Sequence, residues 1–254
     1  MMKLYANGFS PFARKVALVL DYKGLAYETI DGLTHDNRDA LLELNPRAEV
    51  PALVDDDIVV VNSSDIAAYL DLKYPERPIY PAALKDRVEA RALERLADTR
   101  LDAIMLDCSI WLWADRKDTP PPGLLEAGQR DLDTIFARIE EILAAHPSPL
   151  PYEHLTIAEF ALWPHLAALR SLGMTMAPEL YPRLNAWHGA MRRDKLFLND
   201  ARRTGEFMKS LPTNTEFERE RIFWRGDRIE WLLARGFDDW FFAEIRAGRT
   251  IWPE

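Results

Sequence analysis

Residues 3–16, Lys-Leu-Tyr-Ala-Asn-Gly-Phe-Ser-Pro-Phe-Ala-Arg-Lys-Val, decide how the N-terminal part of this chain folds. The start of this segment predicts a short apolar strand. Ser10 and Pro11 follow directly, and they are favoured residue types for the N-cap and the first position of a helix. Gly24 stands where a helix commonly ends. The segment therefore predicts a strand that runs into a helix, with Ser10 at the junction.

Strand and helix signals continue to alternate along the N-terminal third of the chain. They predict a strand over 26–30, a helical turn over 38–44, an antiparallel hairpin over 50–61 and a helix over 63–74. Short alternating elements are typical of an α/β domain. We therefore expect an α/β domain over residues 1–80.

Helical signals dominate beyond a proline-rich linker at 75–81. We expect an all-α domain over 84–254, with helices over 84–116, 124–145, 156–172 and 182–193. The third of these helices begins with Thr156 and Glu159, which form a capping-box pair. It is expected to kink at Pro164 and to close at Gly173.

The last part of this domain, about 200–254, is an aromatic-rich extension with ten of the chain's 27 Phe, Trp and Tyr residues. Phe217, Trp224 and Trp231 recur at heptad spacing, which predicts a helix over 216–235. A shorter helix is expected over 238–247. Because so many aromatic side chains must be buried somewhere, the extension is expected to fold rather than to stay disordered.

Composition excludes several classes of protein. A net charge of −9 argues against nucleic acid as the main partner, since phosphate binding needs clustered basic residues. No apolar run approaches the ~20 residues of a membrane-spanning helix, and the sequence starts without a charged leader, so we expect a cytoplasmic protein. Cys108 is the single cysteine, which excludes an internal disulfide and a Cys-x-x-Cys site.

Standard catalytic motifs are also missing from the sequence. There is no Gly-x-Ser-x-Gly elbow, no phosphate-binding glycine loop and no His-Glu-x-x-His. The five histidines lack metal-ligand spacing, so we expect no metal site. These observations argue against a hydrolase, a kinase or a metalloenzyme.

Among the residues of this sequence, Ser10 is the strongest candidate for a role in catalysis. A hydroxyl and free backbone N–H groups at the positive end of a helix stabilise an anion, and a thiolate held there has a lowered pKa. Ser-Pro is also a common helix start, in which the serine is only an N-cap. The dipeptide alone leaves both readings open.

Three segments together resemble the N-terminal domain of glutathione transferases in order and spacing: Ser10-Pro-Phe-Ala-Arg-Lys-Val16, Asn45-Pro-Arg-Ala-Glu-Val-Pro-Ala-Leu53 and Val61-Asn-Ser-Ser-Asp-Ile-Ala-Ala-Tyr-Leu70. The Ser-Pro-Phe start looks most like the serine-using tau-type and related bacterial members. The resemblance extends through 156–159 and 181–184, so it spans about residues 1–197. It implies a two-domain fold: a thioredoxin-like α/β domain that holds glutathione and a helical bundle.

The resemblance also implies roles for individual residues in binding glutathione as the co-substrate. Ser10 would donate a hydrogen bond to the thiolate, and Val50, before a cis-Pro51, would pair with the cysteinyl unit. Ser63 would bind the γ-glutamyl carboxylate, which agrees with the general preference of anions for a helix start. Two residues depart from the family pattern: Asn62 replaces an acid or a glutamine that faces the γ-glutamyl amino group, and Ala48 replaces the commoner glycine. The remaining implied contacts come from Phe12 and from Arg38, which is placed to reach the glycyl carboxylate.

The second substrate of such an enzyme would lie against the helix after residue 84. Leu101, Met105, Cys108 and Trp111 follow one another at helical spacing, and in this family that helix lines the electrophile pocket. We therefore name Met105, Cys108 and Trp111 as candidate substrate contacts. A stripe of this kind is equally compatible with a buried core.

The leading hypothesis is a cytoplasmic, homodimeric detoxification enzyme that activates glutathione for attack on a small hydrophobic electrophile, by conjugation, dehalogenation or ether cleavage. One alternative is a non-catalytic scaffold of the same fold, in which Ser10 is merely a cap and the aromatic extension binds a protein partner. A thiol-disulfide reductase of the omega type is disfavoured, because omega-type relatives carry a cysteine in the place of Ser10. We expect residues 214–254 to fold back over the helical domain and to cover the electrophile pocket or its rim.

Overall fold

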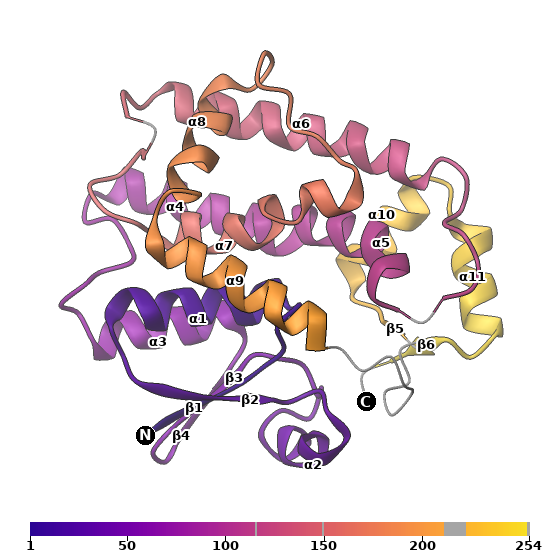
Figure 1. The fold of residues 1–254 in the computed structure, drawn as a ribbon, viewed down its shortest axis with the longest axis horizontal. Coiled ribbons are helices and arrows are strands. Elements are labelled where there is room, and N and C mark those ends of the chain that lie inside the picture. Colours follow the sequence, from indigo (N-terminus) through magenta and orange to yellow (C-terminus); the bar gives the residue numbers. More distant parts are fainter. Residues whose placement is uncertain (115, 149, 211–221, 253–254) are drawn as a thin grey trace.

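The computed structural model describes residues 1–114, 116–148, 150–210 and 222–252. A small sheet lies at one end of the molecule, and a larger helical part lies beside it (Figure 1). Helices α1 and α3 lie between the sheet and the helical part, where α1 packs against α7 and α9. The N-terminal α/β part followed by a mostly helical part confirms the predicted fold class.

The sheet contains four strands in the order β2-β1-β3-β4. Strand β1 pairs in parallel with β2 and antiparallel with β3, so the sheet combines a β-α-β unit with a hairpin. Leu4 and Leu53 face each other across β1 and β3 and are fully buried. The bounds of the strands are Met2–Ala6, Tyr27–Asp31, Ala52–Asp55 and Ile58–Val61 for β1 to β4.

The three helices of this part begin and end close to the predicted residues. Helix α1 (Pro11–Lys23) is capped by Ser10, whose Oγ accepts a hydrogen bond from the N–H of Ala13 at 3.3 Å. Gly24 ends α1 with a φ of 72°, in the left-handed region that favours glycine. Helices α2 and α3 span His35–Leu44 and Ser63–Lys73.

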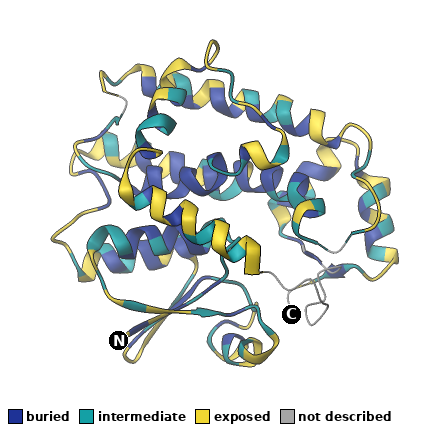
Figure 2. Cartoon of the chain, viewed as in Figure 1, coloured by how far each residue is buried: buried dark blue, intermediate teal, exposed yellow. Residues whose placement is uncertain are grey.

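The helical part is built around a buried central helix, α7 (Ile157–Leu166). Figure 2 shows the centre of the molecule in the colour of buried residues. Thr156 and Glu159 form the predicted capping box of α7, and Trp187 donates a hydrogen bond to the Glu159 carboxylate at 3.0 Å. The surrounding elements are α4 (Leu84–Leu96), α5 (Asp102–Trp113), α6 (Leu124–Ala144) and α8 (Pro182–Met191).

Two predicted helices of this part are interrupted. The stretch expected over 84–116 contains a turn of π-helix, η1 (Ala97–Leu101), between α4 and α5. The helix expected to reach Leu172 ends as an α-helix at Leu166 and resumes as a 3-10 helix, η2 (Leu169–Leu172), closed by Gly173. Short π-helical turns inside α-helices often occur at functional sites.

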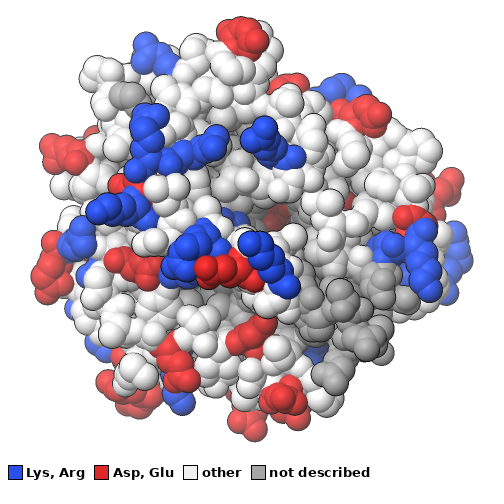
Figure 3. Space-filling view, viewed as in Figure 1, with Lys and Arg blue, Asp and Glu red and all other residues white. Residues whose placement is uncertain are grey.

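Helix α9 (Lys195–Ser210) was not predicted from the sequence. It crosses α1, and its buried residues are Phe197 and Asp200 (Figure 1). On the face shown in Figure 3, basic and acidic side chains lie next to each other. One exposed pair on α9 joins Arg202 to Glu206 at 2.9 Å.

The described part of the extension folds back on the helical part. Strands β5 (Ile222–Phe223) and β6 (Thr250–Ile251) pair in parallel and enclose α10 (Gly226–Ala234) and α11 (Asp238–Arg246). The helix predicted over 216–235 is therefore wrong at 222–225, because β5 pairs with a strand distant in the sequence. Phe217 and the rest of 216–221 lie outside the described residues. Helix α11 confirms the predicted helix over 238–247.

Candidate active site

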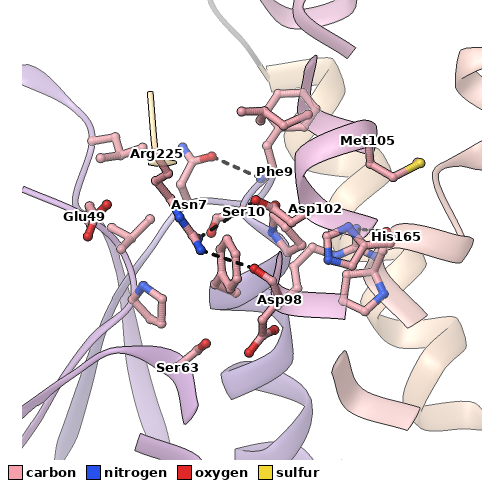
Figure 4. Close-up of a pocket in the computed structure, with 18 of the residues that line it drawn as sticks. Asn7, Phe9, Ser10, Glu49, Ser63, Asp98, Asp102, Met105, His165 and Arg225 are labelled. Atoms are coloured by element: carbon pink, nitrogen blue, oxygen red, sulfur yellow. Dashed lines mark hydrogen bonds and ion pairs between the residues drawn. The ribbon is translucent and has the colours of Figure 1, made fainter. Parts of the chain in front are cut away.

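A cleft of about 2060 Å³ opens between the N-terminal part and the helical part (Figure 4). On one side it is lined by the loop after β1, the loop before β3 and the start of α3. On the other side it is lined by α4, η1 and α5, with further contributions from α9 and the extension. Of the ten residues named from the sequence, eight line this cleft: Ser10, Phe12, Arg38, Val50, Pro51, Asn62, Ser63 and Met105.

Ser10 lies in the cleft at the end of a loop that is held by its own hydrogen bonds. Asn7 anchors this loop: its Oδ1 accepts from the Phe9 N–H at 3.1 Å, and its Nδ2 donates to Asp31 at 3.3 Å. The Ser10 Oγ accepts from Ala13, which satisfies one N–H at the start of α1. A hydroxyl that accepts one bond still has a proton to donate. Ser10 can therefore cap α1 and donate to an anion in the cleft at the same time.

The loop before β3 brings Val50 to the cleft. The Val50–Pro51 peptide bond is cis, as the resemblance implied. The Asn45 side chain donates to the Glu49 carbonyl oxygen at 2.9 Å and closes this loop. Ala48 has a φ of 51°, in the left-handed region where glycine is favoured. The departure noted at Ala48 thus coincides with a backbone conformation that is unfavourable for alanine.

Helix α3 points its N-terminus at the cleft. Ser63 is its first residue and is buried, while Asn62 is its N-cap, with a φ of 72°. The Asn62 Oδ1 accepts from the Ser64 N–H at 3.2 Å. Asn62 therefore uses its oxygen to cap the helix that it precedes. Free N–H groups at such a helix start suit a carboxylate.

A buried polar network beside Ser63 was missed from the sequence. The Lys15 ammonium lies 3.1 Å from Glu94, 2.5 Å from Asp98 and 3.2 Å from the Ser64 hydroxyl. Its side chain is 1% exposed. The network joins α1 and α3 to α4 and η1 across the cleft floor. No local sequence signal identifies it, because Lys15 and its carboxylates are about 80 residues apart in the chain.

The predicted contacts to the second substrate divide into two groups. Met105 lines the cleft, whereas Cys108 and Trp111 do not. Cys108 faces α6, where a Cβ added at Gly128 would lie 2.7 Å from its sulfur, and burial raises the pKa of its thiol. The Trp111 ring packs on Trp240 of α11 at 5.6 Å between centroids. Cys108 and Trp111 therefore pack against neighbouring helices outside this cleft, and their contact with a second substrate stays a prediction.

The extension contributes cleft residues that were not named from the sequence. Arg225 lies with its guanidinium 4.8 Å from the centre of the Phe12 ring. Figure 4 shows Arg225 extending toward Ser10, Asp98 and Asp102. The other described residues of the extension that line the cleft are Ile222, Arg228, Thr250, Ile251 and Trp252. These described residues of the extension therefore border the cleft.

His165 also lines the cleft. It lies on α7 directly after Pro164 and is buried. Burial lowers the pKa of His165 to about 3, so its imidazole is neutral at physiological pH. It can offer one N–H donor and one acceptor to a ligand, without charge.

Comparison with known proteins places this fold in one family. The family described as "Glutathione S-transferase, N-terminal domain" matches residues 4–78, and the family described as "Glutathione S-transferase, C-terminal domain" matches residues 105–190. Together the two matches cover more than half of the chain. The protein belongs to the glutathione S-transferase family, whose members are enzymes that use glutathione as co-substrate.

Individual relatives are distant but cover most of the chain. Mouse glutathione S-transferase omega-1 is 26% identical over 194 residues, or 76% of this chain and 77% of that protein. A solved glutathione S-transferase from Rhodospirillum rubrum aligns with a TM-score of 0.67 and 25% identity, covering 78% of this chain and 90% of that one. The tau-class enzyme of mango aligns with a TM-score of 0.68 and 21% identity, covering 83% and 98%.

Among the described residues, no helix is both long enough and apolar enough to cross a membrane. No group of His, Cys, Asp and Glu within the same ranges is placed to hold a metal ion.

Proposed function

We propose that this protein is a serine-type glutathione transferase, in which Ser10 activates the glutathione thiol for attack on a hydrophobic electrophile. The observation that carries the proposal is the convergence of three separate segments on one cleft. Ser10 at the start of α1, Val50 before β3 and Ser63 at the start of α3 all line it. Each of these positions offers a hydrogen-bonding group that suits one part of glutathione.

Each of these groups has a stated task in the proposed reaction. The γ-glutamyl carboxylate binds at Ser63 and the N-terminus of α3, and the Val50 backbone pairs with the cysteinyl unit. Arg38, exposed on α2 at the edge of the cleft, meets the glycyl carboxylate. These contacts place the sulfur near the start of α1. Residues 1–80 then form the glutathione-binding domain and residues 84–254 supply the second pocket.

In the proposed reaction, Ser10 stabilises the negative charge on the glutathione sulfur. Its hydroxyl donates to the thiolate, and the positive end of α1 favours the same charge. The thiol proton passes to solvent, a carbon–sulfur bond forms, and the leaving group of the electrophile departs with its bonding electron pair. A neighbouring positive environment lowers a thiol pKa and so raises the thiolate fraction near neutral pH.

The alternative scaffold reading required that the aromatic extension bind another protein. In the structure Trp224 is 2% exposed and packs edge-on against Trp240 and Phe241 of the same chain. Trp231 and Phe237 are buried as well. These side chains are therefore used internally, which favours the enzyme over the scaffold. The buried position of Cys108, away from the cleft, likewise disfavours a reductase that depends on a protein thiol.

A homodimer in the cytoplasm, acting in detoxification, completes the proposal. The support for a dimer is a set of exposed apolar side chains on neighbouring N-terminal elements and on α4. Such side chains are available for a contact between two copies of the chain. They are Ile58 and Val59 on β4, Leu72 on α3, and Leu84 and Val88 on α4.

Two measurements on the same preparation test the proposed function. The protein should be retained on immobilised glutathione and eluted by free glutathione. It should also form a conjugate, detected by mass spectrometry, with at least one member of a panel of aryl halides, epoxides and aryl ethers. Binding without any conjugate would favour the scaffold, and absence of both would reject glutathione as the ligand.

A further inference from the structure

We infer that the second substrate carries a carboxylate and that Arg225, from the C-terminal extension, binds it. This inference rests on the proposed function, because it names the chemical class of the electrophile. Arg225 lies outside both matched family regions, which end at residue 190. It reaches the cleft because β5, which ends two residues before it, is paired with β6.

Arg225 is held in place by two kinds of contact: one face of its guanidinium stacks on an aromatic ring, and one of its nitrogens donates hydrogen bonds. Its Nη2 donates to the Asp98 carbonyl oxygen at 3.2 Å and to the Asp227 carboxylate at 3.2 Å. The guanidinium lies over the Phe12 ring, a cation–π arrangement that leaves its edge accessible. Its Nη1 is 4.0 Å from Asp102, beyond hydrogen-bond distance. Within the described residues, the Nη1 and Nε groups thus have donor capacity that no hydrogen bond uses.

Two other arginines that line the cleft, Arg14 and Arg228, are paired with buried carboxylates. Arg14 contacts both oxygens of Asp200 and donates to the Pro164 carbonyl, and its side chain is 10% exposed. Arg228 donates twice to Asp102 and is also 10% exposed. The Arg225 side chain is 28% exposed, so it is the one of the three that a ligand reaches most readily.

The carboxylates around Arg225 leave its charge only partly neutralised. Asp98 is bound by Lys15 at 2.5 Å, and Asp102 is bound by Arg228 at 2.9 Å. Asp227 faces Arg225 at 3.2 Å, has a side chain 23% exposed, and pairs with no other cation among the described residues. A pair that is this exposed is weak, so a ligand carboxylate can compete with Asp227 for the guanidinium. Arginine is well suited to this role because its planar fork matches a carboxylate.

The walls around Arg225 define the rest of the ligand. Apolar side chains from α5, η2 and the extension line this half of the cleft: Met105, Leu106, Leu172, Ile222, Ile251 and Trp252. A largely apolar wall beside an accessible guanidinium suits a ligand with an apolar body and one acidic group. An aromatic or aliphatic electrophile with a carboxylate has this chemistry.

The test compares a chloronitrobenzoate with the corresponding chloronitrobenzamide, which differ mainly in charge. Titration calorimetry measures their binding to the wild-type protein, to Arg225→Met and to Arg225→Lys, in the presence and absence of glutathione. Wild type should bind the benzoate at least about tenfold more tightly, as expected for a charge-assisted hydrogen bond. Arg225→Met should lose this preference and Arg225→Lys should keep part of it, while affinity for the benzamide and for glutathione stays the same.

Two matched variants separate recognition from packing. Arg235→Met removes an arginine of the same extension that pairs with Asp131 outside the cleft, and it should leave the preference unchanged. Asp227→Asn removes the competing acid and should strengthen benzoate binding. An unchanged ratio in Arg225→Met, or an equal loss for both compounds, would overturn the inference. Since binding of the two compounds does not require thiol chemistry, absence of conjugate in the wild type would count against the proposed function and not against Arg225.

Discussion

Arg14 in α1 and Asp200 in α9, 186 residues apart, form a buried ion pair that joins the N-terminal part to the helical part. The Arg14 Nε lies 3.2 Å from both Asp200 oxygens, and its Nη2 lies 2.5 Å from Oδ2. The Trp163 indole N–H donates to the same carboxylate at 2.8 Å. Asp200 therefore receives donors from two other elements, and it explains why α9 lies where it does.

Removal of the charge at Asp200 should strongly destabilise the protein. Asp200→Asn leaves the Arg14 guanidinium buried without its counter-charge, and breaking a buried pair in this way costs about 3–5 kcal/mol. Urea unfolding should show this loss in the free energy of unfolding. Glu206→Gln on the same helix breaks an exposed pair with Arg202, which is worth at most about 0.5 kcal/mol. Equal effects of the two variants would contradict the structural role of Asp200.

Ser10→Ala should lower turnover far more than it lowers stability. Loss of a hydrogen bond to a charged group costs ~1.5–3 kcal/mol, or about 10- to 150-fold in rate if it acts on the reacting thiolate. Loss of the cap on α1 costs only ~1 kcal/mol of stability. Steady-state kinetics and thermal melting measure the two effects separately. Ser10→Thr keeps the hydroxyl and should retain part of the activity; a lower melting temperature with unchanged kinetics in Ser10→Ala would leave Ser10 as a cap alone.

Asn62→Asp should tighten glutathione binding by about tenfold. A hydrogen bond from the γ-glutamyl amino group to a charged acceptor is roughly twice as strong as one to a neutral acceptor. Asp is preferable to Glu here because it can still cap α3 and tolerates the positive φ of this residue. Titration calorimetry gives the dissociation constant. Asn199→Asp adds the same charge on the exposed surface of α9 and is the control. No gain at position 62 would mean that another group already meets the amino group.

Ala48→Gly should stabilise the protein by about 0.5–1 kcal/mol. A non-glycine residue in the left-handed region costs about 1–2 kcal/mol, and glycine removes this strain. Part of the gain is lost because glycine also raises the conformational entropy of the unfolded chain. The φ of 51° at Ala48 is the basis of this expectation. Ala137→Gly, at an exposed position inside α6, should instead destabilise by about 1 kcal/mol. Chemical unfolding of both variants should give changes of opposite sign, and a loss at both sites would contradict the prediction.

Asp107→Asn should become increasingly stabilising, relative to wild type, as the pH rises from about 4 to 7. Both Asp107 carboxyl oxygens are buried and accept no hydrogen bond from the described residues, and burial raises the pKa of this group well above its usual value. In the unfolded chain an aspartate ionises near pH 4. Between about pH 4 and the raised pKa of the folded state, the folded protein therefore binds one proton more than the unfolded chain. Its free energy of unfolding falls as the pH rises through this range. Asparagine does not titrate and lacks this penalty.

Urea unfolding at several pH values measures the Asp107 effect. The difference in unfolding free energy between Asp107→Asn and wild type should grow with pH. Asp57→Asn, an exposed change in the turn between β3 and β4, serves as the control for altered net charge. A constant difference across the pH range would show that Asp107 is ionised in the folded protein.

Local sequence signals predicted the elements around Ser10 well, because their causes are local. Ser10, Pro11 and Gly24 act within one helix, and the Thr156–Glu159 capping box acts within one turn. The cis bond before Pro51 and the assignment of Ser63 to the binding site came from the family resemblance rather than from the residues alone. These positions lie within the region in which the chain resembles its relatives.

Elements that depend on distant partners could not be read in this way. Asp200 is polar in the sequence, so the buried face of α9 lacks a continuous apolar stripe, and its burial depends on Arg14 from the other end of the chain. A local signal was available but was not used: α9 is strongly amphipathic, the Asp194 carboxylate accepts from the Leu196 N–H near its start, and Arg202 and Glu206 stand one turn apart. The heptad of aromatic residues likewise did not reveal β5, because its partner β6 lies 28 residues further along.

The sequence also could not predict that Met105 lines the cleft while Cys108, one turn further along α5, does not. Helix α5 is apolar on several sides, since it packs on α6 and α10 and also borders the cleft. A helix that is apolar all round gives no periodic signal that separates a pocket wall from a core face. The π-helical turn directly before α5 also shifts the direction of the residues that follow it. Arg225 could not be found at all, because its place in the cleft depends on the strand pairing of the extension.

The position of the tryptophans gives this protein a built-in optical signal. Trp113 and Trp252 line the cleft, one from α5 and one from the end of the extension, whereas the remaining six of the eight indoles do not. A ligand that binds beside either ring changes the polarity around that ring and therefore its emission. Replacing Trp113 and Trp252 one at a time by phenylalanine would then show which wall an unlabelled compound touches first.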